Sequence, residues 1–265
     1  MPLFQRRKAD PDGVRSRRFR EDDHGRFWWH KLHATDYEPP IYATLTEREW
    51  RIMADWYAET DRISAIGEIN VPAMSFAQGV VMGNGLRRVV QLGHFYGYSA
   101  LLIGFWLRHM GSDRKLVSID IDPEATKFTQ KWVDKAGLRD QVELYVGDSA
   151  SEEAYRFARD AFGGADPELL LIDSSHAYEH TLRELDLWVP HVPVDALVLL
   201  HDTSIFAQTF DPTGQGGVRR ALDEWLPRHP EVRTLSLNGH EMAGVDGNDI
   251  VYKDGCGLGI MQRVA

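Results

Sequence analysis

The chain has 265 residues, enough for one large core, and its 40 acidic and 30 basic side chains give a formal charge of −10. This charge argues against a general polyanion binder, because neutralising phosphates requires a basic face. The single cysteine, Cys256, excludes an intrachain disulfide and a cysteine-cluster metal site. No apolar run approaches the roughly 20 residues of a membrane span, and none follows the charged N-terminus as in a secretion signal. We therefore expect a soluble, cytoplasmic globular enzyme without nucleic-acid or membrane partners.

The first 40 residues differ in composition from the rest. Residues 6–20 hold seven basic and two acidic side chains with few apolar residues between them. This composition predicts a mobile basic arm, either a solvated tail or a binding element for an anionic partner. The aromatic residues Trp28 and Trp29 are expected to dock on the body of the protein and, with Tyr42, to form a lid that excludes water.

Residues 41–86 are expected to form a helical cap. The sequence Thr-Glu-Arg-Glu at 46–49 has the pattern of a capping box, in which two side chains satisfy backbone amides at a helix start. Apolar residues follow at helical spacing over 50–57 and give this helix one apolar stripe. Pro72 is expected to interrupt the pattern, and a second helix is predicted over about 74–82.

From residue 87 onward, short apolar runs alternate with helical patterns. Uniformly apolar strands between helices indicate a mostly parallel sheet covered on both faces. We therefore predict a doubly wound α/β domain with a seven-stranded sheet over 87–265. The expected strands are 88–92, 115–119, 141–146, 168–172, 194–200, 232–237 and 257–263. The expected helices are 99–109, 123–136, 151–162, 179–188 and 217–228.

The candidate ligand-binding residues follow the predicted strands, because open α/β sheets bind ligands beyond the carboxyl ends of their strands. Gly93 and Gly97 bound a turn that lets the backbone approach a ligand closely. Phe95 stands where a dinucleotide-binding motif requires its second glycine. Asp120 ends the second strand, where a carboxylate can accept both hydroxyls of a ribose. Asp148 follows the third strand, where it can accept an adenine amino group or merely cap the next helix.

Two aspartates are expected to face each other at the tips of adjacent strands. Asp173 follows the fourth strand and Asp202 the fifth. Carboxylates so placed repel one another unless a cation lies between them, and oxygen ligands favour Mg²⁺ or a similar hard cation. Helix capping or a salt bridge is the alternative for each. His176 can reach the same place and suits proton removal near neutral pH, in competition with His180 and His201.

The span from about 89 to 261 resembles the class I S-adenosylmethionine-dependent methyltransferases. More narrowly, it resembles the metal-dependent small-molecule O-methyltransferases, which include the macrolide-sugar enzymes and the related cephalosporin hydroxylase group. Four segments carry the resemblance: VQLGHFYGYS at 90–99, SIDIDP at 118–123, LIDSSHAYE at 171–179 and LLHDT at 199–203.

The resemblance implies a Rossmann-like fold and an S-adenosylmethionine site. The glycine turn and Ser99 would hold the methionine part of this cofactor, and Ser149 would border the adenine with the preceding aspartate. Gln91 stands where the family usually has an acid, which alters one polar contact to the amino end of the cofactor. The implied cofactor-binding residues are Gln91, Gly93, Gly97, Ser99, Asp120, Asp148, Ser149 and Asp173.

The resemblance also implies a divalent-cation site with Mg²⁺ as the expected ion. Asp173 and Asp202 would ligate it, with His201 where relatives often present a further acidic ligand. His201 in place of an acid puts a nitrogen donor at the site and could favour a softer ion. His176 matches the histidine that serves as general base in the sugar-modifying relatives.

The expected function is transfer of a methyl group to a hydroxyl of a small molecule, such as a secondary metabolite or its sugar. Capped enzymes of this type are often homo-oligomers, so a dimer or larger assembly is expected. A metal-assisted hydroxylase on the same fold and an NAD-dependent oxidoreductase are the alternatives. A non-catalytic binding protein is disfavoured by the complete set of acids together with His176.

Overall fold

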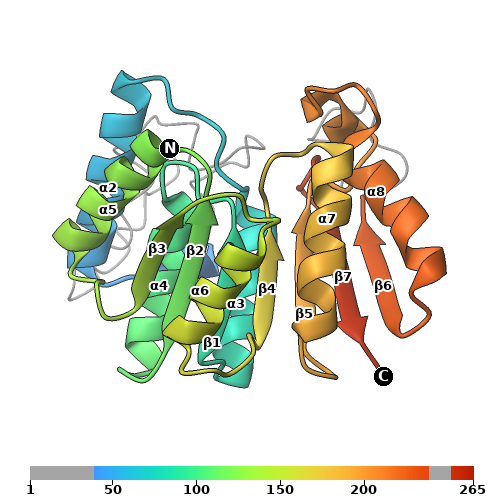
Figure 1. The fold of residues 1–265 in the computed structure, drawn as a ribbon. Helices are drawn as coiled ribbons and strands as arrows, with labels where there is room; N and C mark the ends of the chain where they lie inside the picture. Colours follow the sequence, from blue (N-terminus) through green and yellow to red (C-terminus); the bar gives the residue numbers. More distant parts are fainter. Residues whose placement is uncertain (1–38, 239–251) are drawn as a thin grey trace, which may run out of the picture.

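The computed structural model describes residues 39–238 and 252–265, whose strands lie side by side in one sheet (Figure 1). The strand order is β3-β2-β1-β4-β5-β7-β6. Strands β1 to β5 pair in parallel, whereas β7 runs antiparallel to both β5 and β6. The predicted mostly parallel, seven-stranded, doubly wound sheet is therefore confirmed. The strands are β1 (Arg88–Leu92), β2 (Lys115–Asp120), β3 (Val142–Val146), β4 (Leu169–Ile172), β5 (Leu197–His201), β6 (Val232–Leu237) and β7 (Leu258–Arg263).

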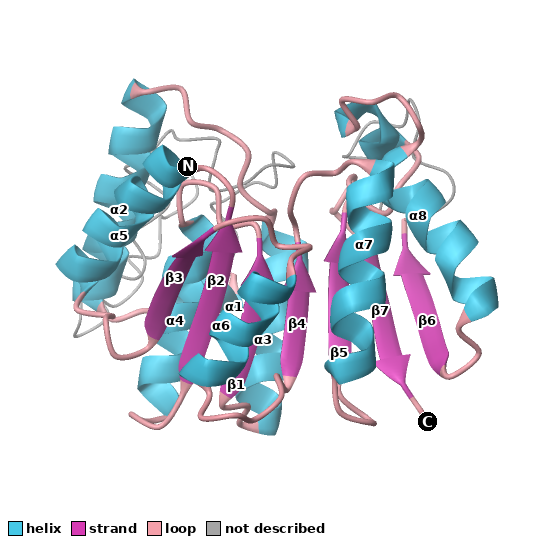
Figure 2. Ribbon diagram, in the orientation of Figure 1, coloured by secondary structure: helices cyan, strands magenta, loops and turns pink. Residues whose placement is uncertain are grey.

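Helices cover both faces of this sheet (Figure 2). Within the described residues from 39 onward, three helices precede the first strand, namely α1 (Pro40–Ala43), α2 (Glu47–Arg62) and α3 (Val71–Asn84). The others alternate with strands and are α4 (Tyr98–Met110), α5 (Pro123–Ala136), α6 (Glu152–Ala161), α7 (Tyr178–Trp188) and α8 (Gly217–Trp225). Short 3-10 turns lie at η2 (Val189–His191), η3 (Phe206–Phe210) and η4 (Leu226–Arg228). Among the described residues, none of the helices is long and apolar enough to cross a membrane.

Alternate strand residues supply two hydrophobic cores, one on each face of the sheet. Val89 and Leu171 belong to the core shared with α1 to α5, whereas Val90 and Leu170 belong to the core shared with α6 to α8. Successive side chains of a strand point to opposite faces, so a strand covered on both faces is apolar at most of its positions. This is why uniformly apolar runs marked these strands in the sequence.

The N-terminal helices differ in one respect from the sequence prediction. The capping box forms as expected: Thr46 Oγ1 accepts a hydrogen bond from the Glu49 amide at 3.3 Å, and Glu49 Oε2 accepts one from the Thr46 amide at 2.7 Å. Helix α3, however, begins at Val71, with Pro72 in its first turn. Proline has no N–H, and the first turn of a helix requires none, so the expected interruption at Pro72 is wrong.

Glu49 also joins α2 to α4. Its side chain is only 1% exposed and accepts hydrogen bonds from His109, at 2.9 Å, and from Arg108. Burial alone would raise the pKa of Glu49, but the hydrogen bonds from His109, Arg108 and the Thr46 amide lower this pKa to about 2. The folded state therefore favours the ionised carboxylate, and this ion pair stabilises the packing of the cap on the sheet domain.

Replacing Glu49 with alanine is expected to lower the free energy of unfolding by about 2–3 kcal/mol, because a buried charged hydrogen-bond network loses its acceptor. The folded-state pKa is depressed, so the stabilisation is present above the ordinary carboxyl pKa and is lost as pH falls from about 4.5 toward about 2. Urea unfolding of both proteins at pH 7 and pH 3 should show a smaller difference at pH 3.

Glu47→Ala is the matched control, because Glu47 pairs with Arg51 on the exposed surface of the same helix. Surface pairs at this spacing contribute at most about 0.5 kcal/mol. Equal losses of stability in the two variants would contradict the role given to Glu49.

Candidate active site

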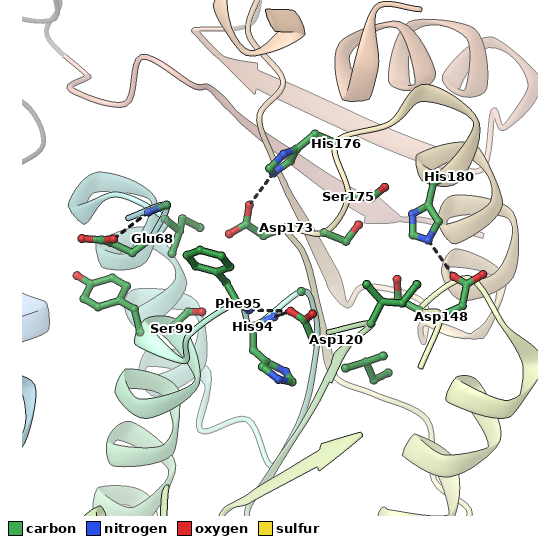
Figure 3. A pocket seen from close by; sticks show the side chains of 18 of the residues that line it. Glu68, His94, Phe95, Ser99, Asp120, Asp148, Asp173, Ser175, His176 and His180 are labelled. Carbon is green, nitrogen blue, oxygen red and sulfur yellow. Dashed lines mark hydrogen bonds and ion pairs between the residues drawn. The ribbon is translucent and has the colours of Figure 1, made fainter. Parts of the chain in front are cut away.

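A cavity of about 500 Å³ lies beyond the carboxyl ends of β1 to β4 (Figure 3). It opens where the strand order reverses between β1 and β4, which is where ligands bind in open α/β sheets. The segment before α3, residues 66–69, closes part of it. The expected site residues that line the cavity are Gly93, Ser99, Asp120, Asp148, Ser149, Asp173 and His176.

The turn after β1 is held by close backbone packing. Gly93 has a φ of 85°, and a Cβ there would lie 2.0 Å from the carbonyl oxygen of Asp173. Gln91 is fully buried behind this turn, where its Nε2 donates to the Gly93 carbonyl at 2.7 Å and to Ser99 Oγ at 2.5 Å. Gln91 therefore holds the turn after β1 in place through these two hydrogen bonds. Gly97, the residue before α4, has a φ of 93° and packs against Thr129 of α5.

Asp120 extends from the tip of β2 into the same cavity (Figure 3). Its Oδ2 accepts hydrogen bonds from the amides of His94, at 3.0 Å, and Phe95, at 2.7 Å. The carboxylate thus joins the turns after β1 and β2. The ring of His94 is buried between Ser118 and Thr126, and burial lowers its pKa to about 4. The ring is therefore uncharged at neutral pH.

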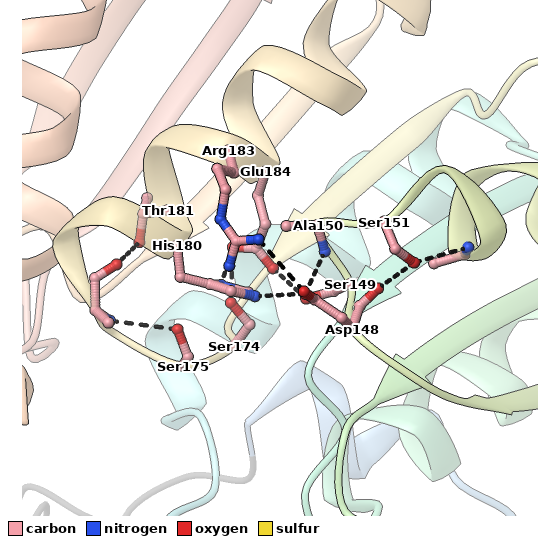
Figure 4. Close-up of polar contacts among 12 residues, drawn as sticks. Asp148, Ser149, Ala150, Ser151, Ser174, Ser175, His180, Thr181, Arg183 and Glu184 are labelled. Carbon is pink, nitrogen blue, oxygen red and sulfur yellow. Dashed lines mark hydrogen bonds and ion pairs between the residues drawn. The ribbon is translucent and has the colours of Figure 1, made fainter.

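Asp148 and His180 lie together at one end of the cavity, away from Glu68 at the other end, with Asp173 between them (Figure 3). Its Oδ1 accepts hydrogen bonds from the Ala150 amide and from His180 Nε2, both at 2.9 Å, and Oδ2 lies 3.4 Å from Arg183 (Figure 4). Burial opposes ionisation, but the Ala150 amide and His180 outweigh it and lower the pKa of Asp148. Helix α6 is capped by Ser151, so capping by Asp148 is not what the structure shows.

A fully buried carboxylate supports this end of the site. Glu184 of α7 accepts hydrogen bonds from Ser149 Oγ at 2.5 Å and Ser174 Oγ at 2.7 Å, and lies 3.5 Å from His180 Nδ1 (Figure 4). Burial opposes the charge on His180, but Glu184 and Asp148 raise its pKa. His180 is thus paired with Asp148 and Glu184, so it does not compete with His176 for the role of base.

Asp173 and Asp202 converge on two histidines. His176 Nε2 lies 3.0 Å from Asp202 Oδ2 and 3.9 Å from Asp173 Oδ1. His201 Nδ1 lies 3.3 Å from each of these oxygens. Asp202 and His201 are only 4% and 5% exposed, whereas the Asp173 and His176 side chains are 15% and 32% exposed and line the cavity. Both His176 and Asp202 have a left-handed backbone, with φ of 58° and 62°, a conformation that costs about 1–2 kcal/mol per residue.

The charges in this cluster balance one another. Burial opposes the charge on His176, but the carboxylates of Asp173 and Asp202 outweigh it and raise its pKa to about 10. The pKa of Asp202 is lowered despite burial, mainly by His201 and His176. At neutral pH His176 therefore holds a proton while the aspartates have no other cation.

The sequence reading missed Asp254. This residue is fully buried in the segment between β6 and β7, and its Oδ2 lies 3.5 Å from His201 Nε2. It follows no parallel strand, so the rule that located the other acids could not find it.

The expected lid residues need a correction. Tyr42 is fully buried in the core rather than at the cavity, and Trp28 and Trp29 lie outside the described residues.

Comparison with known families agrees with this arrangement. Residues 90–203 match the family model described as a methyltransferase domain. The match begins in β1 and ends just beyond Asp202, so it includes all the expected cofactor and cation ligands. The resemblance to class I methyltransferases and the expectation of an enzyme are confirmed.

Solved structures share the fold at low sequence identity. An O-methyltransferase from Bacillus cereus in complex with SAH is 16% identical, with a TM-score of 0.59 over 83% of this chain and 91% of that chain. The O-methyltransferase TomG from Streptomyces achromogenes, involved in tomaymycin synthesis and in complex with SAM, is 20% identical, with a TM-score of 0.57 over 84% and 92%. The SAH-bound methyltransferase PaMTH1 from Podospora anserina is 13% identical, with a TM-score of 0.59 over 83% and 89%. These similarities confirm the methyltransferase fold.

Replacing Gly93 with alanine is expected to lower the free energy of unfolding by about 2–4 kcal/mol, since the new Cβ meets the Asp173 carbonyl and the backbone is left-handed. Gly85→Ala is the matched control, because Gly85 is also left-handed, with a φ of 64°, but has open space around it. Its expected cost is about 1–2 kcal/mol. Denaturant unfolding measures both, and a Gly93 variant no less stable than the control would refute the close packing of β1 on β4.

Proposed function

We propose that this methyltransferase-domain protein transfers the methyl group of S-adenosylmethionine to a hydroxyl oxygen of a small molecule, with the help of a divalent cation. One observation carries the proposal: carboxylates suited to a nucleoside and carboxylates suited to a cation adjoin the same cavity. Asp120 and Asp148 lie at one side of it, and Asp173, beside Asp202, lies at the other. The structural relatives bound to SAH or SAM support the same cofactor here.

The polar groups of the cavity fit the parts of the cofactor. The Asp120 carboxylate, held by three backbone amides at the tip of β2, would accept the ribose hydroxyls. Asp148, oriented by His180, would accept the adenine amino group. Ser99 and the turn at Gly93 would hold the methionine part, since close backbone packing leaves this turn with little freedom. A volume of about 500 Å³ is in the range of small-molecule sites.

A bound cation would lower the pKa of the acceptor hydroxyl. Asp173 and Asp202 would hold this cation, and in doing so would release His176 from the charge of the two carboxylates. His176 Nε2 would then accept the proton of the acceptor hydroxyl. Holding both reactants in line would contribute more than base catalysis alone.

The proposal also covers the acceptor molecule, the oligomeric state and the cellular compartment of the enzyme. The charge of −10 opposes binding to nucleic acid, which leaves a small-molecule hydroxyl as the acceptor. A secondary metabolite or its sugar fits, in keeping with the role of the similar TomG in tomaymycin synthesis. We propose a homo-oligomeric enzyme in the cytoplasm.

Asp120→Asn is expected to weaken SAH binding about tenfold to 100-fold, because the ribose loses charge-assisted hydrogen bonds. Isothermal titration calorimetry measures the affinity, and circular dichroism checks that the variant is folded. Asp113→Asn is the control, because Asp113 pairs with Arg114 on the surface near the other end of β2. Unchanged SAH affinity in the Asp120 variant would remove this residue from the cofactor site.

His176→Gln is expected to lower kcat for methyl transfer by about 10²–10⁴-fold while SAH affinity is retained, because the proton acceptor is lost but the cofactor site is intact. The assay supplies S-adenosylmethionine, divalent cations and a panel of hydroxyl compounds, and mass spectrometry detects the added methyl group. His180→Gln provides the contrast: SAH affinity should fall because His180 orients Asp148. Full turnover by the His176 variant would assign the base to another group, and an oxygenated product would indicate hydroxylase chemistry instead.

A further inference from the structure

We infer that the cation site is built for a transition-metal ion such as Mn²⁺, Fe²⁺ or Zn²⁺ rather than for Mg²⁺, with His201 as a nitrogen ligand and Asp254 as the residue that positions it. The inference rests on the proposed function for the role of the cation. It adds the class of metal and a residue outside the strand-end motifs.

The spacing of three donor atoms carries the first step. His201 Nδ1 lies 3.3 Å from Asp173 Oδ1 and 3.3 Å from Asp202 Oδ2. Ligand atoms bonded to one ion at about 2.0–2.2 Å, with tetrahedral or octahedral angles, are separated by about 3.0–3.5 Å. Both distances from His201 Nδ1 are therefore those of atoms that share one ion.

The other ring nitrogen of His201 shows how the imidazole is oriented. Nε2 lies 3.5 Å from Asp254 Oδ2, and neither atom has a hydrogen-bond partner within the part of the chain that the structure describes. If Nδ1 binds an ion, the ring proton must be on Nε2, facing the Asp254 carboxylate. Metal-binding histidines commonly donate their second N–H to a carboxylate, which fixes the tautomer and the ring orientation.

Asp254 is itself held in place. Its Oδ1 accepts hydrogen bonds from Asn70 Nδ2 at 2.7 Å and from the amides of Cys256, at 3.0 Å, and Gly257, at 3.1 Å. One oxygen of the fully buried carboxylate is thus fixed, and the other faces His201. Asn70 is the residue that precedes α3, so the cap also contributes to this contact.

The mixture of donors selects the metal class. Mg²⁺ prefers oxygen ligands in a strict octahedron, whereas imidazole nitrogen suits Fe²⁺ and Zn²⁺, and Mn²⁺ is the weakest binder of the first-row divalent series. His176 Nε2, 3.0 Å from Asp202 Oδ2, places a second imidazole beside the same carboxylates. Two aspartates with the His201 nitrogen therefore do not form the all-oxygen site that Mg²⁺ favours.

Calorimetric titration of chelator-treated full-length protein tests the metal class. We expect Mn²⁺ to bind at least about tenfold more tightly than Mg²⁺. Electron spin-echo spectra of the Mn²⁺-loaded protein should contain nitrogen coupling that persists in His176→Gln and is lost in His201→Gln. Equal affinities without nitrogen coupling would overturn the inference. Binding of neither ion, with intact SAH affinity, would also overturn it and assign the cluster to a salt-bridge network.

Two variants test the positioning role of Asp254. Asp254→Asn should weaken Mn²⁺ binding about tenfold to 100-fold, as loss of such a supporting carboxylate commonly does. Asp223→Asn, which alters an exposed pair with Arg219, should leave this affinity unchanged. The double variant His201→Glu/Asp254→Asn replaces the nitrogen donor by oxygen and should shift the preference toward Mg²⁺, and an unaltered preference would contradict ligation by His201. Failure of the wild-type protein to bind SAH would instead refute the proposed function.

Discussion

The structure depends on how buried negative charge is neutralised at the carboxyl ends of the strands. Asp173 and Asp202 occupy the tips of β4 and β5, where 15% and 4% of their side chains are exposed. An unpaired carboxylate in such a place costs several kcal/mol. In this chain, His176 and His201 supply the positive charge that balances the two aspartates.

The other end of the cavity follows the same principle. Asp148 and the fully buried Glu184 share His180, and two serine hydroxyls donate to Glu184. Each cluster thus combines two acids with imidazole groups.

The antiparallel strand β7 also helps to position the residues around His201. Strand β7 lies between β5 and β6, which brings the segment before it, with Asp254, against His201 at the end of β5. The hydrogen bond from Asn70 to Asp254 then connects the N-terminal helices to the same point. The cap and the final hairpin are therefore joined at the candidate cation site.

Periodicity and position in the sequence determined most of the fold. All seven strands and the helices of the sheet domain follow from short apolar runs alternating with 3.6-residue patterns, because a sheet covered on both faces requires apolar residues at most positions of its strands. The acids at Asp120, Asp148, Asp173 and Asp202 could be found because each follows a parallel strand, and parallel strands end at one edge. Pro72 was misread because a proline within a helix and one in its first turn look alike in sequence.

Only the tertiary structure decided which histidine meets which acid. The sequence favoured His176 as the base, with His180 and His201 as competitors. Helix α7 directs His180 to Asp148, whereas the turn after β4 places His176, and the end of β5 places His201, beside Asp173 and Asp202. Asp254 is distant in sequence and carries no local signal, so its contact with His201 arises only when β7 inserts beside β5. The physical reason is that secondary structure depends on neighbours along the chain, whereas charge pairing depends on which loops the sheet order brings together.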